Sequence, residues 1–355
     1  MAKASAMSGV ARLDVGEPQF ETPEHIVEGA FAAARNGFTK YTASAGLIST
    51  RQAIAADAAA TADTIAITVG AVGALSSAVR AVVDVGDDVL IPDPGWPNYI
   101  AIVKCSGAEP RPYALSEENG FAPTVRDLEG ALTPRAKAIV INTPANPTGA
   151  VFSRGVMEMV LDFARAHDLY VISDEVYSKI VFEPPHTSAW GLGDDERVII
   201  ANSLSKTYSM TGWRIGWAQA APDMAAQIAK LQEASVSCCS SIAQKAAEAA
   251  LSGSQECVKT ALCAYRQNLE IAEAVLDAHG LAYTHSAGTF FLWVDTGCDD
   301  TWRFADQLLQ ERKVAVAPGE AFGHQGAGRV RLSLASSVDQ VRYGVRELAD
   351  FCEAT

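Results

Sequence analysis

The segment 202–216 holds the residues with the most evident chemistry in the chain. Lys206 follows an apolar run that we expect to form a buried strand, and burial lowers the pKa of an amine and frees it for Schiff-base formation. Ser203, Ser205 and Arg214 offer two hydroxyls and a planar guanidinium, a set that suits a phosphate dianion. On this segment alone, an exposed turn with a solvated lysine is an equally good interpretation.

Two other segments place polar side chains directly after predicted strands. Asn146 lies in the turn-rich segment 142–149, whereas Asp174 and Tyr177 lie in 173–177. Open parallel sheets bind ligands at the carboxyl ends of their strands. A carboxylate at the edge of a buried sheet needs a cationic partner, and for Asp174 a protonated pyridinium nitrogen within reach of Tyr177 would serve. Asn146 could instead be a simple turn residue, and Asp174 a helix cap or structural ion pair.

A fourth segment, 70–73, has the sequence Gly-Ala-Val-Gly and opens a predicted helix directly after a strand. Backbone amides at a helix start bind phosphate, and small residues allow the phosphate to come close. Glycine alone is weak evidence because turns use it everywhere.

These segments belong to a chain that alternates β-rich runs with Ala-rich amphipathic stretches from about residue 63. The predicted strands cover 65–69, 88–91, 138–142, 169–173, 197–201 and 213–218. Predicted helices cover 71–85, 96–104 and 153–167, the last capped by Ser153. Continuous apolar strands alternating with helices predict a mostly parallel sheet with helices on both faces.

After residue 222 the pattern changes to long helical stretches, through 251 and again over 254–279. Shorter elements follow, predicted as a strand at 290–295, a helix at 300–312, a strand at 329–334 and a last helix. We therefore expect a large domain over 36–253 and a smaller α+β domain over 254–355. Residues 1–35 would form an N-terminal segment of the small domain.

The composition of the chain disfavours several classes of binding partner. Lys and Arg total 28 against 42 Asp and Glu, and the formal net charge of -14 disfavours nucleic acids and anionic membranes as partners. We find neither a signal peptide nor a run of about 18 apolar residues, so we expect a cytoplasmic protein without a membrane partner. The seven scattered cysteines fit reduced thiols, which we interpret as small buried side chains, and we expect no metal site.

Taken together, the motifs show that the chain resembles the class I and II aminotransferases of the aspartate aminotransferase superfamily. The resemblance extends from Leu13 to Ser333 and rests on NPTG at 146–149, SDEVY at 173–177 and S-x-S-K at 203–206, with Arg214 eight positions later. It implies fold type I of the pyridoxal-phosphate enzymes. That fold has a large α/β domain, whose mostly parallel, seven-stranded-type sheet is sandwiched by helices, and a smaller α+β domain.

The resemblance also implies roles around the cofactor ring. Lys206 resembles the lysine that holds pyridoxal 5'-phosphate as a Schiff base and later moves the substrate proton. Asp174 resembles the carboxylate that keeps the pyridine nitrogen protonated. Asn146 and Tyr177 resemble the pair that hydrogen-bonds the phenolic oxygen. Trp96 matches the aromatic residue that stacks on the ring, although without the match it would be interpreted as core.

For the phosphate, the resemblance implies side chains and backbone amides from two segments, namely Ser203, Ser205, Arg214, Gly70, Ala71 and Val72. Many relatives have a polar or basic residue where Val72 stands, which would leave more of the binding to the amides and Arg214. Tyr41 resembles the tyrosine that the neighbouring subunit lends to this phosphate.

For the substrate, Arg331 resembles the arginine that binds the α-carboxylate in a bidentate fork. Arg329 has the same sequence face, and only the resemblance separates the two. Gly16 matches the glycine that lets the backbone approach the substrate, and Asn146 and Trp96 are expected to border the same space.

We therefore expect a homodimeric aminotransferase that moves an amino group from an L-amino acid to a 2-oxo acid by a ping-pong mechanism. The short N-terminal arm suggests that the large domain holds the dimer together. Aspartate or glutamate is the donor that the family suggests, with aromatic or other neutral amino acids close behind. One alternative is a C–S or β-eliminating lyase, because the same ring motifs serve that chemistry. A non-catalytic ligand sensor is a weaker alternative, since few residues precede Gly16 and the charge is acidic.

Overall fold

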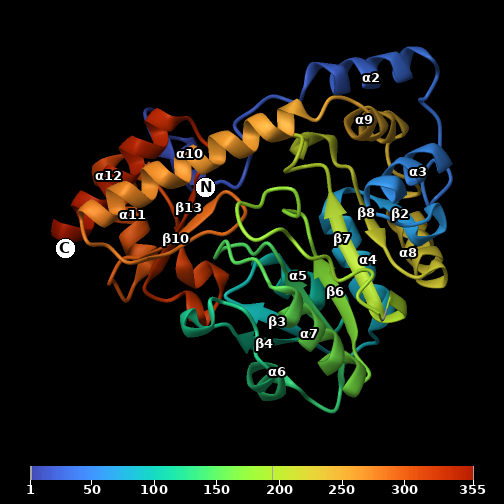
Figure 1. The fold of residues 1–355 in the computed structure, drawn as a ribbon, viewed down its shortest axis with the longest axis horizontal. Coiled ribbons are helices and arrows are strands. Elements are labelled where there is room, and N and C mark those ends of the chain that lie inside the picture. Colours follow the sequence, from blue (N-terminus) through green and yellow to red (C-terminus); the bar gives the residue numbers. More distant parts are fainter. Residues whose placement is uncertain (1, 194, 355) are drawn as a thin grey trace.

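The computed structural model describes residues 2–193 and 195–354, and its larger part is built on one seven-stranded sheet (Figure 1). The strand order is β2-β8-β7-β6-β5-β3-β4. The strands are β2 (Ile65–Thr68), β3 (Asp88–Asp93), β4 (Glu109–Ala114), β5 (Ala136–Asn142), β6 (Tyr170–Asp174), β7 (Val198–Ser203) and β8 (Gly216–Gln219). In this sheet β8 alone runs opposite to the other six strands, so the expected mostly parallel sheet is confirmed.

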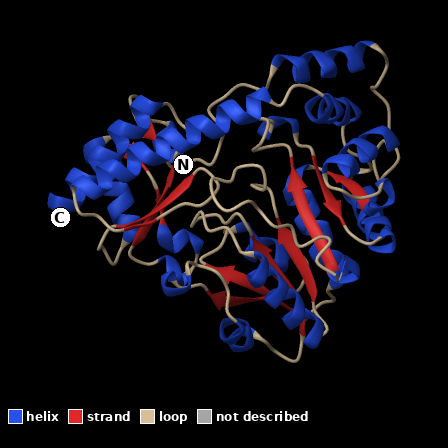
Figure 2. Ribbon diagram, in the orientation of Figure 1, coloured by secondary structure: helices blue, strands red, loops and turns tan. Residues whose placement is uncertain are grey.

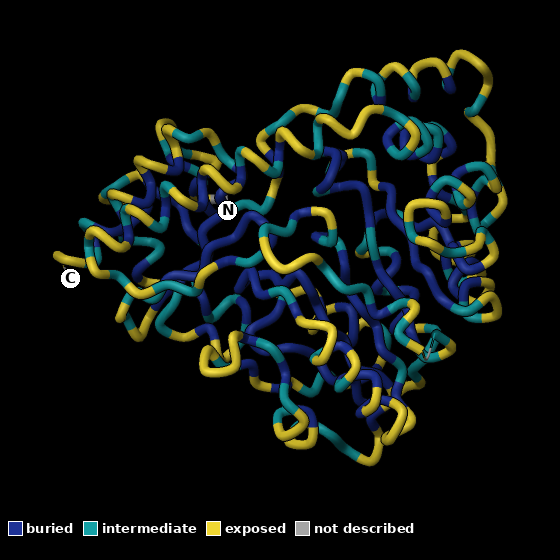
Figure 3. The backbone as a smooth tube through the Cα atoms, in the orientation of Figure 1, coloured by how far each residue is buried: buried dark blue, intermediate teal, exposed yellow. Residues whose placement is uncertain are grey.

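Helices cover both faces of this sheet (Figure 2). One apolar cluster joins the sheet to α4 (Gly70–Val82), α5 (Asn98–Cys105) and α8 (Pro222–Val236). The opposite cluster joins it to α6 (Val125–Ala131) and α7 (Arg154–Ala166). In β5, Ile139 faces one cluster and Val140 the other, because side chains alternate along a strand. Burial on both faces explains the continuous apolar runs of the sequence (Figure 3).

The second part of the molecule is built on a four-stranded antiparallel sheet of order β12-β13-β10-β9. Its strands are β9 (Tyr283–Thr284), β10 (Phe291–Asp295), β12 (Ala317–Pro318) and β13 (Arg329–Ser333). The helices α11 (Thr301–Arg312) and α12 (Val338–Ala354) pack on it, together with the end of α10 (Glu256–Ala278).

The N-terminal residues contact both parts. After α1 (Ala2–Ser5), β1 (Ala11–Arg12) pairs in parallel with β11 (Val314–Ala315), beside the small sheet. Farther along, α2 (Glu24–Arg35) and α3 (Ile48–Asp57) pack against α9 (Ser241–Ser252), on the side of the large sheet. The domain boundaries drawn from the sequence stay a prediction.

Three local expectations are wrong. The helical pattern through 251 is divided between α8 and α9, and Ser237 after α8 has a φ of 62°. The strand expected from 213 begins only at 216, because Arg214 adopts a left-handed conformation that cannot extend a strand. All seven cysteines are free, but only Cys239 is buried, and Cys105 and Cys263 lie exposed on helices.

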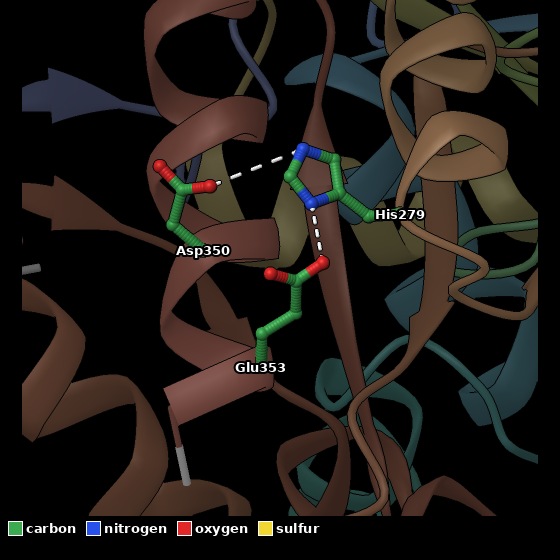
Figure 4. Close-up of side chains that lie close together, drawn as sticks. All are labelled: His279, Asp350 and Glu353. Atoms are coloured by element: carbon green, nitrogen blue, oxygen red, sulfur yellow. Dashed lines mark hydrogen bonds and ion pairs between the residues drawn. The ribbon is translucent and has the colours of Figure 1, made fainter.

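The ends of α10 and α12 are tied together by a histidine (Figure 4). His279 Nδ1 lies 2.8 Å from Glu353 Oε1, and Nε2 lies 3.9 Å from Asp350 Oδ1. Since each ring nitrogen faces a different carboxylate of α12, His279 links the end of α10 to α12.

Among the described residues, no helix combines the length and apolar character needed to cross a bilayer.

Candidate active site

The carboxyl ends of the parallel strands open onto a cavity of about 310 Å³ that also reaches the small sheet. Because β8 is antiparallel, it begins at this edge, which brings Arg214 to the end where the other strands finish. Most residues expected at the site line this one cavity: Gly16, Ala71, Val72, Trp96, Asn146, Asp174, Tyr177, Ser203, Ser205, Lys206, Arg214 and Arg331. The structure therefore brings together residues from segments far apart in the sequence.

Lys206 is a partly buried amine held in place by a backbone carbonyl. Its Nζ donates a 2.6 Å hydrogen bond to the carbonyl oxygen of Gly16. A Cβ at Gly16 would lie 2.7 Å from the Phe291 ring, so only glycine allows this approach. Burial lowers the pKa of Lys206 to about 8, and the nearby guanidinium groups of Arg331 and Arg214 act in the same direction. The alternative of a solvated lysine in an exposed turn is wrong.

Asp174, at the end of β6, is a buried carboxylate with only 4% of its surface exposed. The hydroxyl of Tyr99 donates a 2.7 Å hydrogen bond to its Oδ2, and the amide of Val176 donates a 3.3 Å bond to Oδ1. Burial raises the pKa of Asp174 to about 6, while the bond from Tyr99 opposes that shift. The carboxylate is thus ionised above pH 6 and lines the cavity.

The loop that carries Asn146 is fixed by a second asparagine, Asn142, the last residue of β5. Asn142 Nδ2 donates to the carbonyl oxygen of Asp174 at 3.0 Å, and its Oδ1 accepts the backbone amide of Asn146 at 2.8 Å. This side chain therefore couples the two loops. Neither Asn142 nor Tyr99 was predicted from the sequence, although Asn142 lies four positions before Asn146 and Tyr99 three positions after Trp96.

Arg331, on β13, lies against two aromatic rings and is 7% exposed. Its guanidinium carbon is 4.1 Å from the Phe291 ring centre and 4.9 Å from that of Phe322. Nη1 donates to Asn146 Oδ1 at 2.9 Å, and Nη2 donates to the carbonyl oxygen of Asp14 at 2.8 Å. Nε is buried without a hydrogen-bond partner among the described residues. Burial lowers the pKa of Arg331 to about 10.

Arg329, the other candidate on the same strand, points elsewhere. Its Nη2 lies 2.5 Å from Glu117 Oε2 and outside the lining of the cavity. The structure thus distinguishes two arginines that the sequence pattern left equivalent.

The region expected to bind phosphate lies where α4 begins. Arg214 Nη1 donates a 2.7 Å bond to the carbonyl oxygen of Thr211. A Cβ at Gly70 would lie 2.5 Å from Arg214 Nη2, which places this guanidinium against the first residue of the helix. Ser203 and Ser205 are buried beside it. Tyr41 is not part of this arrangement within one chain, because it is 88% exposed and does not line the cavity.

A wider cavity of about 950 Å³ lies on the face of β7 and β8 that carries Trp217 and Gln219. Among the residues with site chemistry it shares only Ser203 with the first cavity, and neither Lys206 nor Asp174 lines it. The candidate site is therefore the smaller cavity.

The observed groups fit pyridoxal phosphate. A carboxylate that is ionised above pH 6 can pair with a pyridinium nitrogen, an amine of lowered pKa can react with an aldehyde, and an arginine beside a helix start can bind phosphate. The unpartnered Nε of Arg331 leaves a buried donor for a further anion. Fold and site together define a pyridoxal-phosphate-type transferase of fold type I.

The chain belongs to the aminotransferase class I and II family, whose model matches residues 8–348. It is 36% identical over 362 residues to the aspartate aminotransferase of Geobacillus stearothermophilus, covering 97% of this chain and 92% of that protein. The solved aspartate aminotransferase from Thermus thermophilus with maleate superimposes with a TM-score of 0.94 at 35% identity, over 99% of this chain and 94% of the other.

An aromatic aminotransferase from Pyrococcus horikoshii OT3 gives a TM-score of 0.94 at 33% identity, over 99% of this chain and 98% of the other. These matches confirm the resemblance, the fold class and an aminotransferase function, and they do not favour the lyase alternative.

Proposed function

We propose that this chain binds pyridoxal phosphate through Lys206 and uses it to transfer an amino group from an L-amino acid to a 2-oxo acid in a ping-pong cycle. The observation that supports this proposal most directly is that Lys206, Asp174 and Arg331 line a single cavity. When bound, the cofactor supplies an aromatic ring that withdraws electrons from the substrate Cα.

Lys206 performs the proton transfer in this proposal. Because its pKa is lowered to about 8, an appreciable fraction of the amine is neutral near neutral pH and can act as a nucleophile. The Gly16 carbonyl orients Nζ. The Lys206 amine would act as the base that takes the proton from the substrate Cα and as the acid that delivers it to the cofactor carbon bonded to the transferred nitrogen.

The remaining ring contacts are assigned by position. The Asp174 carboxylate pairs with the pyridine nitrogen and keeps it protonated, and Asn146 and Tyr177 hydrogen-bond the phenolic oxygen. Trp96, which lines the cavity, stacks on the ring. Burial raises the pKa of Tyr177 well above its ordinary value, so its hydroxyl stays a hydrogen-bond donor over the working pH range.

The phosphate is bound by Ser203, Ser205, Arg214 and the amides of Ala71 and Val72 at the start of α4. The exposed ring of Tyr41 is available to a second copy of the chain. We therefore propose a homodimer with composite sites, in which each subunit lends Tyr41 to the other.

Arg331 binds the substrate α-carboxylate. Its two terminal nitrogens each use one hydrogen on a protein oxygen, which leaves a second hydrogen on each for a carboxylate.

The aspartate aminotransferases among the relatives support aspartate or glutamate as the amino donor, and the aromatic enzyme keeps aromatic amino acids as the second choice. The seven free cysteines support a reducing, cytoplasmic location.

The test is an ultraviolet and visible absorption spectrum of the protein with added pyridoxal phosphate, repeated with a panel of amino acids. We expect a band from the lysine-bound cofactor that is absent in Lys206→Ala and is bleached by particular amino acids, with release of a 2-oxo acid. Release of ammonia instead would support a lyase. A protein that shows no band at all would contradict the proposal.

A further inference from the structure

A group of hydrogen bonds joins the large sheet to the small sheet away from the residues proposed to contact the cofactor ring. It joins Asp93, the last residue of β3, to the turn 322–325 before β13. Asp93 Oδ2 accepts the amide of His324 at 3.1 Å, and Oδ1 accepts the amide of Gln325 at 3.0 Å. Two residues later, the amide of Gly95 donates a 2.8 Å bond to the carbonyl oxygen of Phe322.

The turn is shaped to receive this carboxylate. Gly323 has a φ of 126°, a conformation that side chains rarely adopt. A Cβ at Gly323 would lie 2.1 Å from Asp93 Oδ1, so any larger residue would displace the carboxylate. Asp93 is itself buried, and a buried carboxylate is costly unless its hydrogen bonds are made.

The turn 322–325 also carries a side chain that packs against Arg331. The Phe322 ring lies 4.9 Å from the Arg331 guanidinium and packs edge-on against Trp293 at 5.7 Å. The Phe291 ring centre lies 4.1 Å from the same guanidinium carbon. Because the Phe322 backbone is bonded to Gly95 and its turn to Asp93, the position of this ring is set from the large sheet.

We propose that Asp93 is a positioning residue for substrate binding: it fixes the turn 322–325, and through Phe322 it holds Arg331 in the orientation that receives the substrate carboxylate. This inference rests on the proposed role of Arg331. Asp93 does not touch the substrate. It aligns the guanidinium before the substrate arrives, so its loss should weaken substrate binding far more than turnover.

The test compares Asp93→Ala with Asp88→Ala, which removes a buried carboxylate from the other end of the same strand, where Asp88 pairs with Arg111. We expect Asp93→Ala to raise KM for both substrates about tenfold, with kcat within about threefold of wild type. Asp93→Asn keeps one acceptor oxygen, so its KM should lie between those of wild type and Asp93→Ala. Asp88→Ala should leave KM unchanged.

Two further measurements separate positioning from folding. Hydrogen exchange of the cofactor-free protein should speed up at the amides of His324 and Gln325 in Asp93→Ala but not in Asp88→Ala. Gly323→Ala should reproduce the rise in KM, and its effect should not add to that of Asp93→Ala, since both break one contact.

The outcomes distinguish this inference from the proposed function. A wild-type protein that turns over no amino acid would overturn the proposed function and the positioning role that depends on it. A wild-type protein that transaminates, while the KM of Asp93→Ala matches that of Asp88→Ala, would overturn only the positioning role. A fall in kcat at unchanged KM would also overturn it.

Discussion

The guanidinium of Arg331 donates a 2.9 Å hydrogen bond to the side-chain oxygen of Asn146, a residue 185 positions away in the sequence. Asn146 follows β5 of the large sheet, and Arg331 lies on β13 of the small sheet. The bond therefore joins the group proposed to bind the cofactor ring to the group proposed to bind the substrate. A substrate that docks on Arg331 is aligned with the ring by the same contact.

This geometry predicts that Arg331→Lys will weaken substrate binding strongly. Lysine offers a point charge in place of a planar fork, and it cannot keep the bonds to Asn146 and Asp14 while also binding a carboxylate. We expect KM for the amino acid to rise about 100-fold, which corresponds to about 2.7 kcal/mol. Steady-state kinetics measure this change, and the absorption of the bound cofactor should be unaltered. Arg329→Lys is the control, with an expected change below about threefold; equal effects of the two variants would refute the assignment.

The hydroxyl of Tyr99 predicts a pH effect. Because its hydrogen bond to Asp174 opposes the rise in the pKa of that carboxylate, Tyr99→Phe should move the pKa of Asp174 upward from about 6. The titration profile of Asp174 in the cofactor-free protein, followed by NMR of its carboxyl carbon, should move up by about one pH unit, equivalent to about 1.4 kcal/mol. Pyridoxal-phosphate affinity, measured by fluorescence titration at pH 6 and pH 8, should fall more at pH 6. Unchanged profiles would show that Tyr99 only fills space.

Asp174 should also reduce the stability of the cofactor-free protein. Its pKa is raised to about 6 from an ordinary 3.8, so the folded state holds the proton more tightly than the unfolded state. The cost of ionisation therefore appears as pH rises from about 4 to 6 and is complete above 6. Asp174→Asn cannot ionise, and it should be more stable than wild type at pH 8 by about 3 kcal/mol.

Urea unfolding of the cofactor-free proteins between pH 5 and pH 8 measures this difference, which should shrink toward the acidic end. Asp162→Asn, on the exposed face of α7, should show no such trend. With pyridoxal phosphate added, the order should reverse, because only the carboxylate can pair with the ring. A less stable Asp174→Asn protein at pH 8 without cofactor would be inconsistent with a costly buried charge.

Lys206 should be the lysine whose reactivity rises at the lowest pH. Its pKa is lowered to about 8, so in the cofactor-free protein its labelling by acetic anhydride should increase through a midpoint near pH 8. Competitive labelling followed by peptide mass spectrometry gives the midpoint, with the exposed Lys104 as an internal reference. The Lys206 midpoint should move upward in Arg331→Leu, which removes a nearby positive charge. A midpoint above pH 10 in the wild type would contradict the buried amine.

Much of the fold could be predicted because both faces of the sheet are buried. Strands such as β5 and β6 read as unbroken apolar runs, and each is followed by a polar loop at the same edge. The motifs around Asn146, Asp174 and Lys206 could be placed at this edge because each directly follows a predicted strand. The clustering of these three side chains in one cavity agrees with that expectation, while the roles assigned to them stay predictions.

What the sequence could not show are contacts between distant segments. Tyr99 lies within the predicted helix 96–104, and nothing local indicated that its hydroxyl donates a hydrogen bond to Asp174. Nothing in the sequence indicated that the rings of Phe291 and Phe322 both lie against Arg331. The left-handed backbone at Arg214 was missed because it depends on how the chain turns back to start β8. Each of these depends on tertiary packing that local patterns do not encode.

The helix α10 is embedded in both halves of the molecule. At 23 residues it is about 34 Å long, with Val258 near its start packed among residues around the large sheet and Leu276 near its end in the core of the small sheet. Because a helix is stiff, a tilt at one end of α10 moves the other end. A tilt of about 5° at the start of α10 would displace its far end by about 3 Å. Small adjustments of packing near Val258 can therefore become ångström-scale movements of the small sheet that carries Arg331.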